Sequence, residues 1–300
     1  MLLIASPDEN AGALVQLVGN TLSSDHSRRA YGVALRAFLA WYQATGCGRF
    51  DGSALESWKV HLQGVGLAAS SVNLKLSAVR KLAAVGVAGG YLDAAVAAGV
   101  QRVKGVKTAG VRSGRWLTHD EAQRLLMVPD VKTLKGLRDR AILAVMLGCG
   151  LRRSEVAALT VRHVQQREGR WVIVDMLGKG LRVRSVPMPS WTKAALDGWT
   201  AAAGVTSGRL FRTTRGAAVA DSMTAQAVAD VVRKYSRLAG VQVAAHDLRR
   251  TFAKLAYGGG AKLDQVQLSL GHASILTTQR YLGLLQDLQD APCDRLGLRL

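Results

Sequence analysis

The segment from His246 to Tyr281 carries three short motifs, which are H-D-L-R-R-T-F at 246–252, L-G-H-A-S at 270–274 and T-T-Q-R-Y-L at 277–282. His246 and Arg249 stand three residues apart, so on a helix their side chains share one face. An imidazole and a guanidinium on one face, followed by a tyrosine, favour a phosphate site. A metal site would need carboxylates or a Cys/His cluster at ligand spacing, and the segment has neither.

The charge of the whole chain points in the same direction. The 300 residues include 40 Lys and Arg against 21 Asp and Glu, a formal net charge of +19. A chain this basic is expected to have a polyanionic partner, most often nucleic acid. A ribosome-associated protein or a merely basic surface are the alternatives. The length allows about two domains, and 49% hydrophobic residues can form their cores.

The cysteines and the N-terminus bear on the compartment. Cys47, Cys149 and Cys293 are odd in number, far apart and outside any CxxC pattern, which is typical of ordinary thiols in a reducing compartment. The N-terminus has no basic region before its short apolar run, and no apolar run approaches a membrane span. We expect a cytoplasmic, nucleoid-associated protein that does not enter a membrane.

Residues 1–101 are predicted to form a helical bundle of four or five helices, because strand signals are absent. Ser24 or Asp25 can cap a helix that runs to about Thr45, and later helices are expected at about 53–63, from 70 and at 92–98. The first helix has an apolar stripe at helical spacing, formed by Tyr31, Leu35, Phe38, Leu39 and Tyr42.

Residues 102–115 read as a linker, with five basic residues, three glycines and no acid. A basic linker between two basic domains fits a protein that closes around a DNA duplex as a clamp. An ordinary solvated hinge is the alternative.

Residues 116–300 form the second predicted domain, mainly α with a small β-sheet. Thr118 and Glu121 have the spacing of a capping box. Arg152 and Glu155 stand three apart, so the carboxylate can hold the guanidinium ready for a phosphate, although a surface ion pair is the alternative. Two β-branched runs, 171–174 and 182–186, predict a hairpin with Lys179 at its tip, which could equally be an exposed turn lysine.

The ordered set of motifs is more specific than any one of them. G-L-R-R-S-E at 150–155 and G-K-G-x-x-x-R-x-V-P at 178–187 precede the three motifs of the His246–Tyr281 segment. This set closely resembles the tyrosine recombinase (phage integrase) family, and the stretch 27–41 adds a weaker resemblance in the first domain. The resemblance implies a SAM-like core-binding domain followed by a catalytic domain of the integrase, DNA breaking-rejoining type. The absence of an arm-binding domain before residue 20 favours the simple two-domain type.

The resemblance also implies a site and a reaction. It places the family's catalytic residues on Arg152, Lys179, His246, Arg249, His272 and the nucleophile Tyr281, with Glu155 as the supporting acid. Arg250 is expected to point elsewhere by helix geometry. The implied reaction is cleavage and rejoining of DNA through a covalent 3′-phosphotyrosine, without a metal or another cofactor. The implied assembly is a homotetramer on two double-stranded DNA sites with inverted repeats, with accessory recombination proteins as further partners.

In this chemistry the two arginines stabilise the charge that builds on the phosphate oxygens. The phenol of Tyr281 has an ordinary pKa near 10, so either nearby cations favour the phenolate or His246 takes the proton. Lys179 is the expected donor to the leaving 5′-oxygen, and His272 is expected to hydrogen-bond the phosphate.

Other expectations concern DNA contacts and the C-terminal tail. Leu282, Leu285 and Leu288 form an apolar stripe that, by resemblance, packs on a neighbouring protomer, with folding back on its own domain as the alternative. The rival functions are a type IB topoisomerase and an architectural DNA-binding protein without catalysis. The basic side chains expected to contact DNA are Arg28, Arg29, Lys75, Arg80, Lys104, Lys107 and Arg184.

Overall fold

The computed structural model describes residues 7–46, 48–107, 115–177, 183–215, 218–220 and 222–283. The chain divides into two compact units, Met1–Val111 and Arg112–Leu300. Each unit has its own hydrophobic core. None of the helices within these ranges has the length and apolar character needed to cross a membrane.

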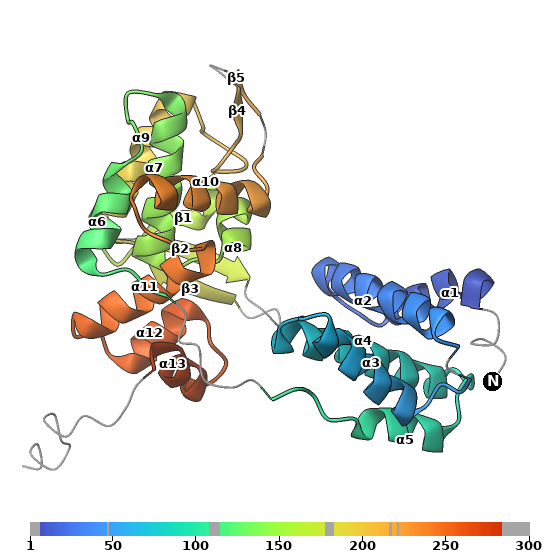
Figure 1. Ribbon diagram of the computed structural model, residues 1–300. Coiled ribbons are helices and arrows are strands. Elements are labelled where there is room, and N and C mark those ends of the chain that lie inside the picture. The colour runs from blue at the N-terminus through green and yellow to red at the C-terminus, as the bar shows by residue number, and fades with distance from the viewer. Residues whose placement is uncertain are drawn as a thin grey trace, which may run out of the picture. The chain divides into compact units, whose positions relative to one another are not determined.

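The first unit is a bundle in which the described residues form five helices (Figure 1). The helix α4 contacts each of the other four. The bounds are α1 Pro7–Asn20, α2 Asp25–Ala44, α3 Gly52–Gly64, α4 Ala69–Ala88 and α5 Ala94–Arg102.

The predicted stripe of α2 lies in the core of this bundle. Leu35 and Phe38 are buried, and the Phe38 ring meets Trp58 of α3 edge-on with 4.9 Å between centroids. Such edge-to-face pairs place the positive ring edge on the negative ring face. Ser24 caps α2 by accepting the Ser27 amide, as its position predicts. The helical expectation for this unit is therefore confirmed, and α1, which the sequence analysis leaves out, extends it.

The chain just after α5 remains attached to the bundle. The Asn73 side chain donates to the Val106 carbonyl at 3.0 Å and accepts the Val106 amide at 2.8 Å. The Arg80 guanidinium donates to the Val103 carbonyl, and the Val103 side chain is buried. The first residues of the predicted linker are thus packed on α4, mostly by polar side chains that bind the backbone.

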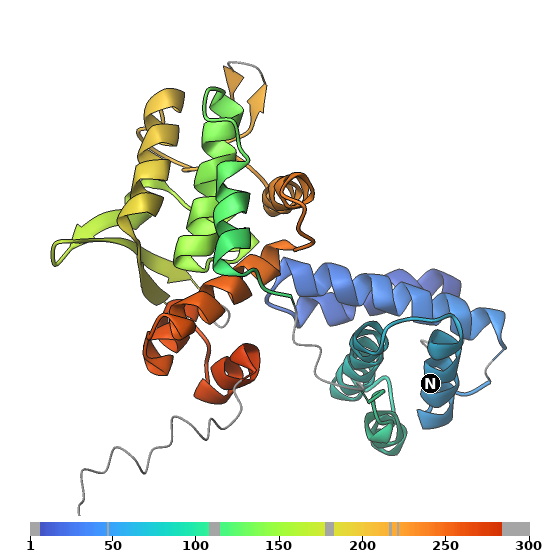
Figure 2. The same ribbon diagram turned by 60° about the vertical axis from the view of Figure 1, so that its left-hand side comes forward.

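The second unit is built around α7 (Leu134–Cys149), which contacts α6, α8, α9, α10 and α11. Figure 2 shows α7 between α9 and α10. An apolar helix surrounded in this way has buried residues on every face, which explains its continuous hydrophobic sequence. The other helices are α6 His119–Met127, α8 Arg153–Ala158, a 3₁₀ turn Val161–His163, α9 Ser190–Ala203, α10 Ala225–Leu238, α11 Ala245–Gly258, α12 Leu263–Leu270 and α13 Ile275–Leu282.

A three-stranded antiparallel sheet lies beside these helices, in the order β1 (Val164–Arg167), β2 (Arg170–Leu177), β3 (Val183–Pro187). The β2–β3 pair is the predicted hairpin, with Ile173 opposite Val186 and an irregular register before Met176. Lys179 lies outside the described residues. A second, two-stranded pair, β4 (Thr214–Arg215) and β5 (Ala218–Val219), has strands too short to leave a sequence pattern.

The start of this unit is attached to α11. The predicted capping box is present, with the Thr118 hydroxyl accepting the Glu121 amide at 3.2 Å and the Glu121 carboxylate accepting the Thr118 amide at 2.9 Å. One residue earlier, the Leu117 amide donates to the Thr251 hydroxyl of α11 at 2.9 Å. The entry to the second unit is therefore fixed to the helix that carries His246 and Arg249.

Candidate active site

Glu155, on the first turn of α8, is the centre of the site. Its carboxylate accepts from the Arg152 guanidinium at 2.7 Å and from the Arg152 amide at 2.8 Å. It also accepts from Arg184 of β3 at 2.9 Å, and Arg249 of α11 lies 3.9 Å away. Glu155 orients Arg152, as predicted, and it brings together arginines from three separate parts of the unit.

The charges around Glu155 hold it ionised. Burial alone would raise the pKa of its carboxyl group. The hydrogen bonds from Arg184 and from the Arg152 backbone, with the charges of both guanidinium groups, outweigh burial and lower the pKa below its ordinary value. A buried carboxylate with three cationic neighbours stays charged at neutral pH.

Arg249 is fully buried and connects two helix ends. Its guanidinium donates to the carbonyl of Gly150, at the end of α7, with a distance of 2.6 Å, and to the carbonyl of Leu270, at the end of α12. Carbonyl groups at a helix C-terminus carry the negative end of the helix dipole and favour a cation. Burial lowers the pKa of Arg249 to about 10, so the side chain remains charged at neutral pH.

Two glycines leave room for neighbouring side chains at the site. Gly150 and Gly271 adopt the left-handed conformation, with φ of 61° and 63°. A Cβ atom on Gly150 would lie 2.4 Å from the Phe252 ring, and one on Gly271 would lie 2.9 Å from the Arg184 side chain. The glycines of the G-L-R-R and L-G-H motifs are therefore needed both for conformation and for space.

Tyr281, on α13, contacts both of the predicted histidines. Its ring centroid is 5.7 Å from that of His246 and 5.2 Å from that of His272, edge-on in both cases. Its hydroxyl donates to the His246 carbonyl at 3.5 Å. The structure thus brings together a tyrosine, two imidazoles and the arginine cluster from motifs far apart in the sequence.

Helix geometry predicted that Arg250 points away from the site, and this prediction is wrong. Its guanidinium carbon lies 4.9 Å from the centroid of the Tyr281 ring. The prediction considered only the direction of Arg249 on an isolated α11. It failed because α13 packs against α11 and brings Tyr281 to the face that Arg250 occupies.

Both histidines are neutral at pH 7. Burial, followed by the charges of Arg249 and Arg152, lowers the pKa of His272 to about 4. His246 is more exposed, yet partial burial of its imidazole, followed by the charges of Arg249 and Arg250, also lowers its pKa. The His272 Nδ1 lies 3.0 Å from the hydroxyl of the buried Thr278, which fixes the orientation of the ring.

Tyr281 itself is a neutral phenol in this arrangement. Its partial burial raises its pKa above the ordinary value, and the opposing charges of Arg249 and Arg250 only reduce that effect. The nearby cations do not by themselves produce the phenolate in the DNA-free protein.

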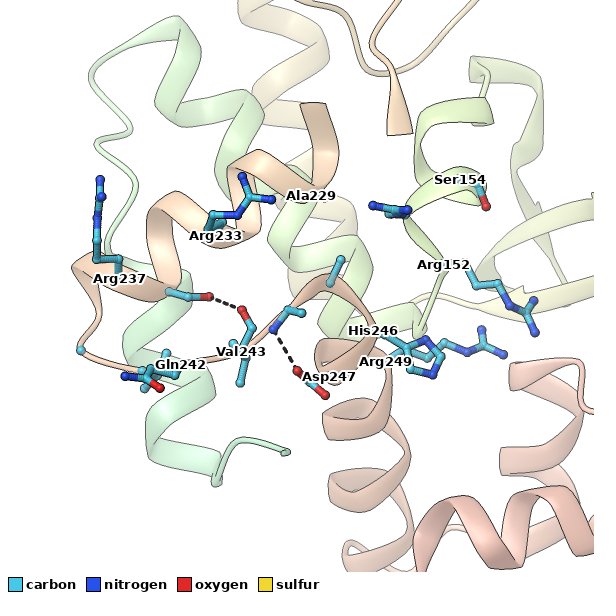
Figure 3. A pocket seen from close by; sticks show the side chains of 16 residues that line it. Arg152, Ser154, Ala229, Arg233, Arg237, Gln242, Val243, His246, Asp247 and Arg249 are labelled. Atoms are coloured by element: carbon cyan, nitrogen blue, oxygen red, sulfur yellow. Dashed lines mark hydrogen bonds between the residues drawn. The ribbon is translucent and has the colours of Figure 1, made fainter. Parts of the chain in front are cut away.

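A cleft of about 1010 Å³ opens beside the site. Figure 3 shows Arg233 and Arg237 of α10 on one side of it and Arg152 on the other. Arg153 also lines the cleft. Arg153, Arg233 and Arg237 were not predicted from the sequence, although the four-residue spacing of the last two on an amphipathic helix was a usable signal.

The residues predicted to contact DNA have different surroundings. The prediction that Arg184 contacts DNA is wrong, because its side chain is only 8% exposed and donates to Glu155 and to the Ser269 carbonyl. Arg80 is engaged with the Val103 carbonyl, and Lys75 is half-buried. The remaining predicted contacts, Arg28, Arg29, Lys104 and Lys107, are exposed.

Of the leucine stripe predicted for the C-terminal tail, the structure describes only Leu282. Leu282 is buried in its own unit against α11 and α12, so this member of the stripe does not reach a neighbouring protomer. Leu285 and Leu288 lie outside the described residues.

Comparisons with known proteins agree with this site. Residues 115–287 match the Phage integrase family, and residues 15–88 match the phage integrase N-terminal SAM-like domain. The tyrosine recombinase XerD of Pseudomonas aeruginosa is 31% identical over 284 residues, which cover 88% of this chain and 90% of that protein. The XerD of Ralstonia nicotianae is 39% identical over 178 residues, which cover 57% of this chain and 56% of that protein.

Solved structures show the same fold. The XerH site-specific recombinase bound to palindromic difH substrate superimposes with a TM-score of 0.70 at 21% identity, covering 85% of this chain and 76% of that chain. A lambda integrase dimer bound to a COC′ core site gives a TM-score of 0.69 at 15% identity, covering 91% of this chain and 75% of that chain. With both of its units matched by family and by fold, the chain belongs to the phage integrase family and is a tyrosine recombinase.

Proposed function

We propose that this recombinase cleaves and rejoins DNA at a specific site through a covalent bond between Tyr281 and a DNA 3′-phosphate. The observation that carries the proposal is the position of Tyr281, in contact with His246 and His272 and beside the arginine cluster. A tyrosine packed only for stability would not need two neutral imidazoles and buried guanidinium groups around it.

In this proposal Arg152 and Arg249 bind the scissile phosphate. Arg152 keeps 31% of its side chain exposed while Glu155 holds it from one side, so its remaining N–H groups are free to meet a ligand from the cleft. The guanidinium fork matches the geometry of phosphate oxygens. Because both cations are fixed before DNA binds, they stabilise the charge of the transition state without reorganising.

His246 serves as the general base. Tyr281 is protonated in the DNA-free protein and His246 is neutral, so the imidazole is in the correct state to accept the phenolic proton. The neutral His272 accepts the Thr278 hydroxyl at Nδ1 in this proposal and donates its single N–H, at Nε2, to the phosphate. Lys179 protonates the leaving 5′-oxygen. The tyrosyl ester conserves the energy of the phosphodiester bond, so rejoining consumes no nucleotide.

The duplex runs along the cleft beside α10. Arg153, Arg233 and Arg237 add positive charge to it. Residues 1–101 act as the helical core-binding domain, 102–115 as the connection and 116–300 as the catalytic domain. Basic side chains that the structure leaves exposed on the first unit, such as Arg29 and Lys107, contribute further phosphate contacts.

Recombination would take place in a homotetramer on two inverted-repeat sites, with the chain beyond Gly283 packing on a neighbouring protomer. Leu268 of α12 and Leu276 of α13 are each 61% exposed, and these apolar side chains on the last two described helices support an apolar partner there. Deleting the residues after Asp287 is expected to reduce cooperative synapsis while cleavage of a single site continues. Unchanged synapsis would argue that the tail folds on its own unit.

The nucleophile is tested with a suicide substrate, a recombination site nicked so that the cleaved fragment diffuses away. The inverted-repeat site is first selected by binding from randomised duplexes. Wild-type protein is expected to accumulate a covalent adduct, and Tyr281→Phe is expected to bind the DNA without forming one. Adduct formed by Tyr281→Phe would overturn the assignment.

Lys179 is tested with a 5′-bridging phosphorothiolate, whose leaving group needs no proton. Lys179→Ala is expected to cleave it far better, relative to wild type, than it cleaves ordinary DNA. Equal defects on both substrates would contradict the acid role. Relaxation of a plasmid that lacks the site would instead indicate a type IB topoisomerase.

A further inference from the structure

We infer that Arg250 is a positioning residue for the nucleophile, which holds the Tyr281 ring in the site and favours its ionised form. This inference rests on the proposed function, because it assumes that Tyr281 attacks DNA. Arg250 was predicted to point away from the site. Its described contacts are with the Tyr281 ring and the Asp247 carboxylate, not with the histidines or the buried arginines.

The first observation is the stacking geometry. The Arg250 guanidinium carbon lies 4.9 Å from the Tyr281 ring centroid, within the range of a cation–π interaction. The two histidines meet the same ring edge-on at 5.2 and 5.7 Å. The ring therefore has a cation over it and two imidazoles nearly perpendicular to it, so these contacts restrict its position.

The second observation is how Arg250 is held. Asp247, one turn earlier on α11, accepts the Ala244 amide at 2.9 Å and thereby caps the helix. Another oxygen of the same carboxylate lies 3.8 Å from the Arg250 guanidinium. Among the described residues, the Arg250 Nε is buried without a hydrogen-bond partner. The guanidinium thus has one carboxylate at 3.8 Å and also lies over the Tyr281 ring.

The third observation is electrostatic. The charged and titratable groups around Tyr281 are His246, Asp247, Arg249 and Arg250 of α11, His272 before α13 and Arg152 before α8. Burial of the phenol raises the pKa of Tyr281, and the charges of Arg249 and Arg250 oppose that rise. Arg249 has its guanidinium bonded to two carbonyl groups, whereas Arg250 faces the ring itself. A cation over an aromatic ring stabilises the electron-rich phenolate more than the phenol, so Arg250 assists the proton transfer to His246.

The variant Arg250→Gln removes this charge and keeps a polar side chain, and Arg250→Lys retains the charge without the flat guanidinium. Lys254→Gln is the matched control. Lys254 lies one turn further along α11, where it covers the Trp116 ring at 4.6 Å instead of Tyr281. Losing one positive charge from the same helix is therefore common to R250Q and K254Q.

The direct measurement replaces Tyr281 alone by 3-fluorotyrosine and follows its ionisation by ¹⁹F NMR without DNA. The titration midpoint is expected to move to higher pH in R250Q, to move less in R250K and to stay unchanged in K254Q. If R250Q does not fold, the shift in R250K decides. Equal midpoints in wild type and the Arg250 variants would overturn the inference.

The kinetic measurement uses single-turnover cleavage of the suicide substrate at saturating DNA. R250Q is expected to be about tenfold slower at neutral pH, with the deficit shrinking as the pH rises and when position 281 carries the more acidic fluorotyrosine. A deficit that is the same at every pH and with either phenol would show a structural role only and overturn the inference. If wild type itself forms no adduct, the proposed function fails, while the ¹⁹F titration still judges the effect of Arg250 on the phenol.

Discussion

At the scale of single residues, the site is a set of buried charges that stabilise one another. Glu155 contacts Arg152 and Arg184 and lies near Arg249, and the last two arginines also bond the end of α12. Charged groups in a protein interior are tolerated when they are paired and hydrogen-bonded, and removing one partner leaves the others uncompensated. The same side chains therefore support the fold and the proposed chemistry.

Glu155→Gln is expected to lower the free energy of unfolding by about 3 kcal/mol at neutral pH, because it leaves buried guanidinium groups without their counter-charge. The folded-state pKa of Glu155 lies below its unfolded value of about 4.3. Its contribution is thus present above that pH and is lost as the pH falls through the folded-state pKa. Urea unfolding from pH 7 to 3 should show the two proteins converging in acid.

The control for that measurement is Asp197→Asn in the same unit. Asp197 pairs with Lys193 at 2.7 Å, and its own side chain is 58% exposed. The carboxylate of such a pair stays solvated and contributes little, so this variant is expected to stay within about 1 kcal/mol of wild type. A loss as large as that of Glu155→Gln would show that general charge removal, not the buried cluster, destabilises the unit.

The free energy of unfolding also depends on pH through His272. Its folded-state pKa of about 4 lies below the unfolded value near 6.5, so its contribution to stability is present above pH 6.5 and is lost as the pH falls toward 4. His272→Asn keeps a polar group that can hydrogen-bond the Thr278 hydroxyl but cannot titrate, and it is expected to flatten the stability curve in this window. The urea midpoints of His119→Asn, at an exposed position, should follow the wild-type curve.

At the scale of elements, the ends of the helices position the site. Gly150 ends α7, accepts the Arg249 hydrogen bond and lies against Phe252. Gly204 ends α9 with the same φ of 61°, but a Cβ atom there would meet nothing within 4 Å. These two glycines separate the conformational effect of a side chain from the steric one.

Gly204→Ala is expected to destabilise the unit by about 1 kcal/mol, the usual effect of a left-handed non-glycine residue. Gly150→Ala adds the clash with Phe252 and displaces the carbonyl that holds Arg249, so it is expected to lose at least about 2 kcal/mol more and to cleave DNA slowly. Melting temperatures and adduct formation measure both. Equal effects of the two substitutions would contradict the role assigned to Gly150.

These elements also show what the sequence could and could not predict. The stripe of α2, the Thr118 capping box, the β2–β3 hairpin and the Arg152–Glu155 pair depend on neighbours close in sequence, and each was predicted. Arg184 was predicted to contact DNA, and the sequence could not show that its side chain is buried, because that burial depends on α12, which follows about eighty residues later. Arg250 was misjudged for the same reason, since its partner lies on α13. Lys179 lies outside the described residues, so its placement stays a prediction.

At the scale of the whole molecule, the excess of positive charge should appear as a salt dependence of DNA binding. Arg233 and Arg237 line the cleft beside the site. If both meet phosphates, replacing both with Gln should reduce the slope of log K against log salt by about 1.8, roughly 0.9 for each contact. Fluorescence titrations at several salt concentrations would measure the slope.

The matched control removes two other cations from the same unit. Lys132 and Lys135 are exposed at the beginning of α7 and do not line the cleft. Replacing both with Gln changes the net charge equally and is expected to leave the slope almost unchanged. Identical slopes for the two double variants would place the duplex elsewhere.

The contacts of Arg249 make assembly of the active site depend on folding of the second unit. Its guanidinium reaches its place only when the ends of α7 and α12 have both docked around it. A newly made or heat-damaged chain in which α12 has come loose therefore has no assembled cluster with which to activate a phosphate. We therefore expect strand cleavage to depend on complete folding of this unit.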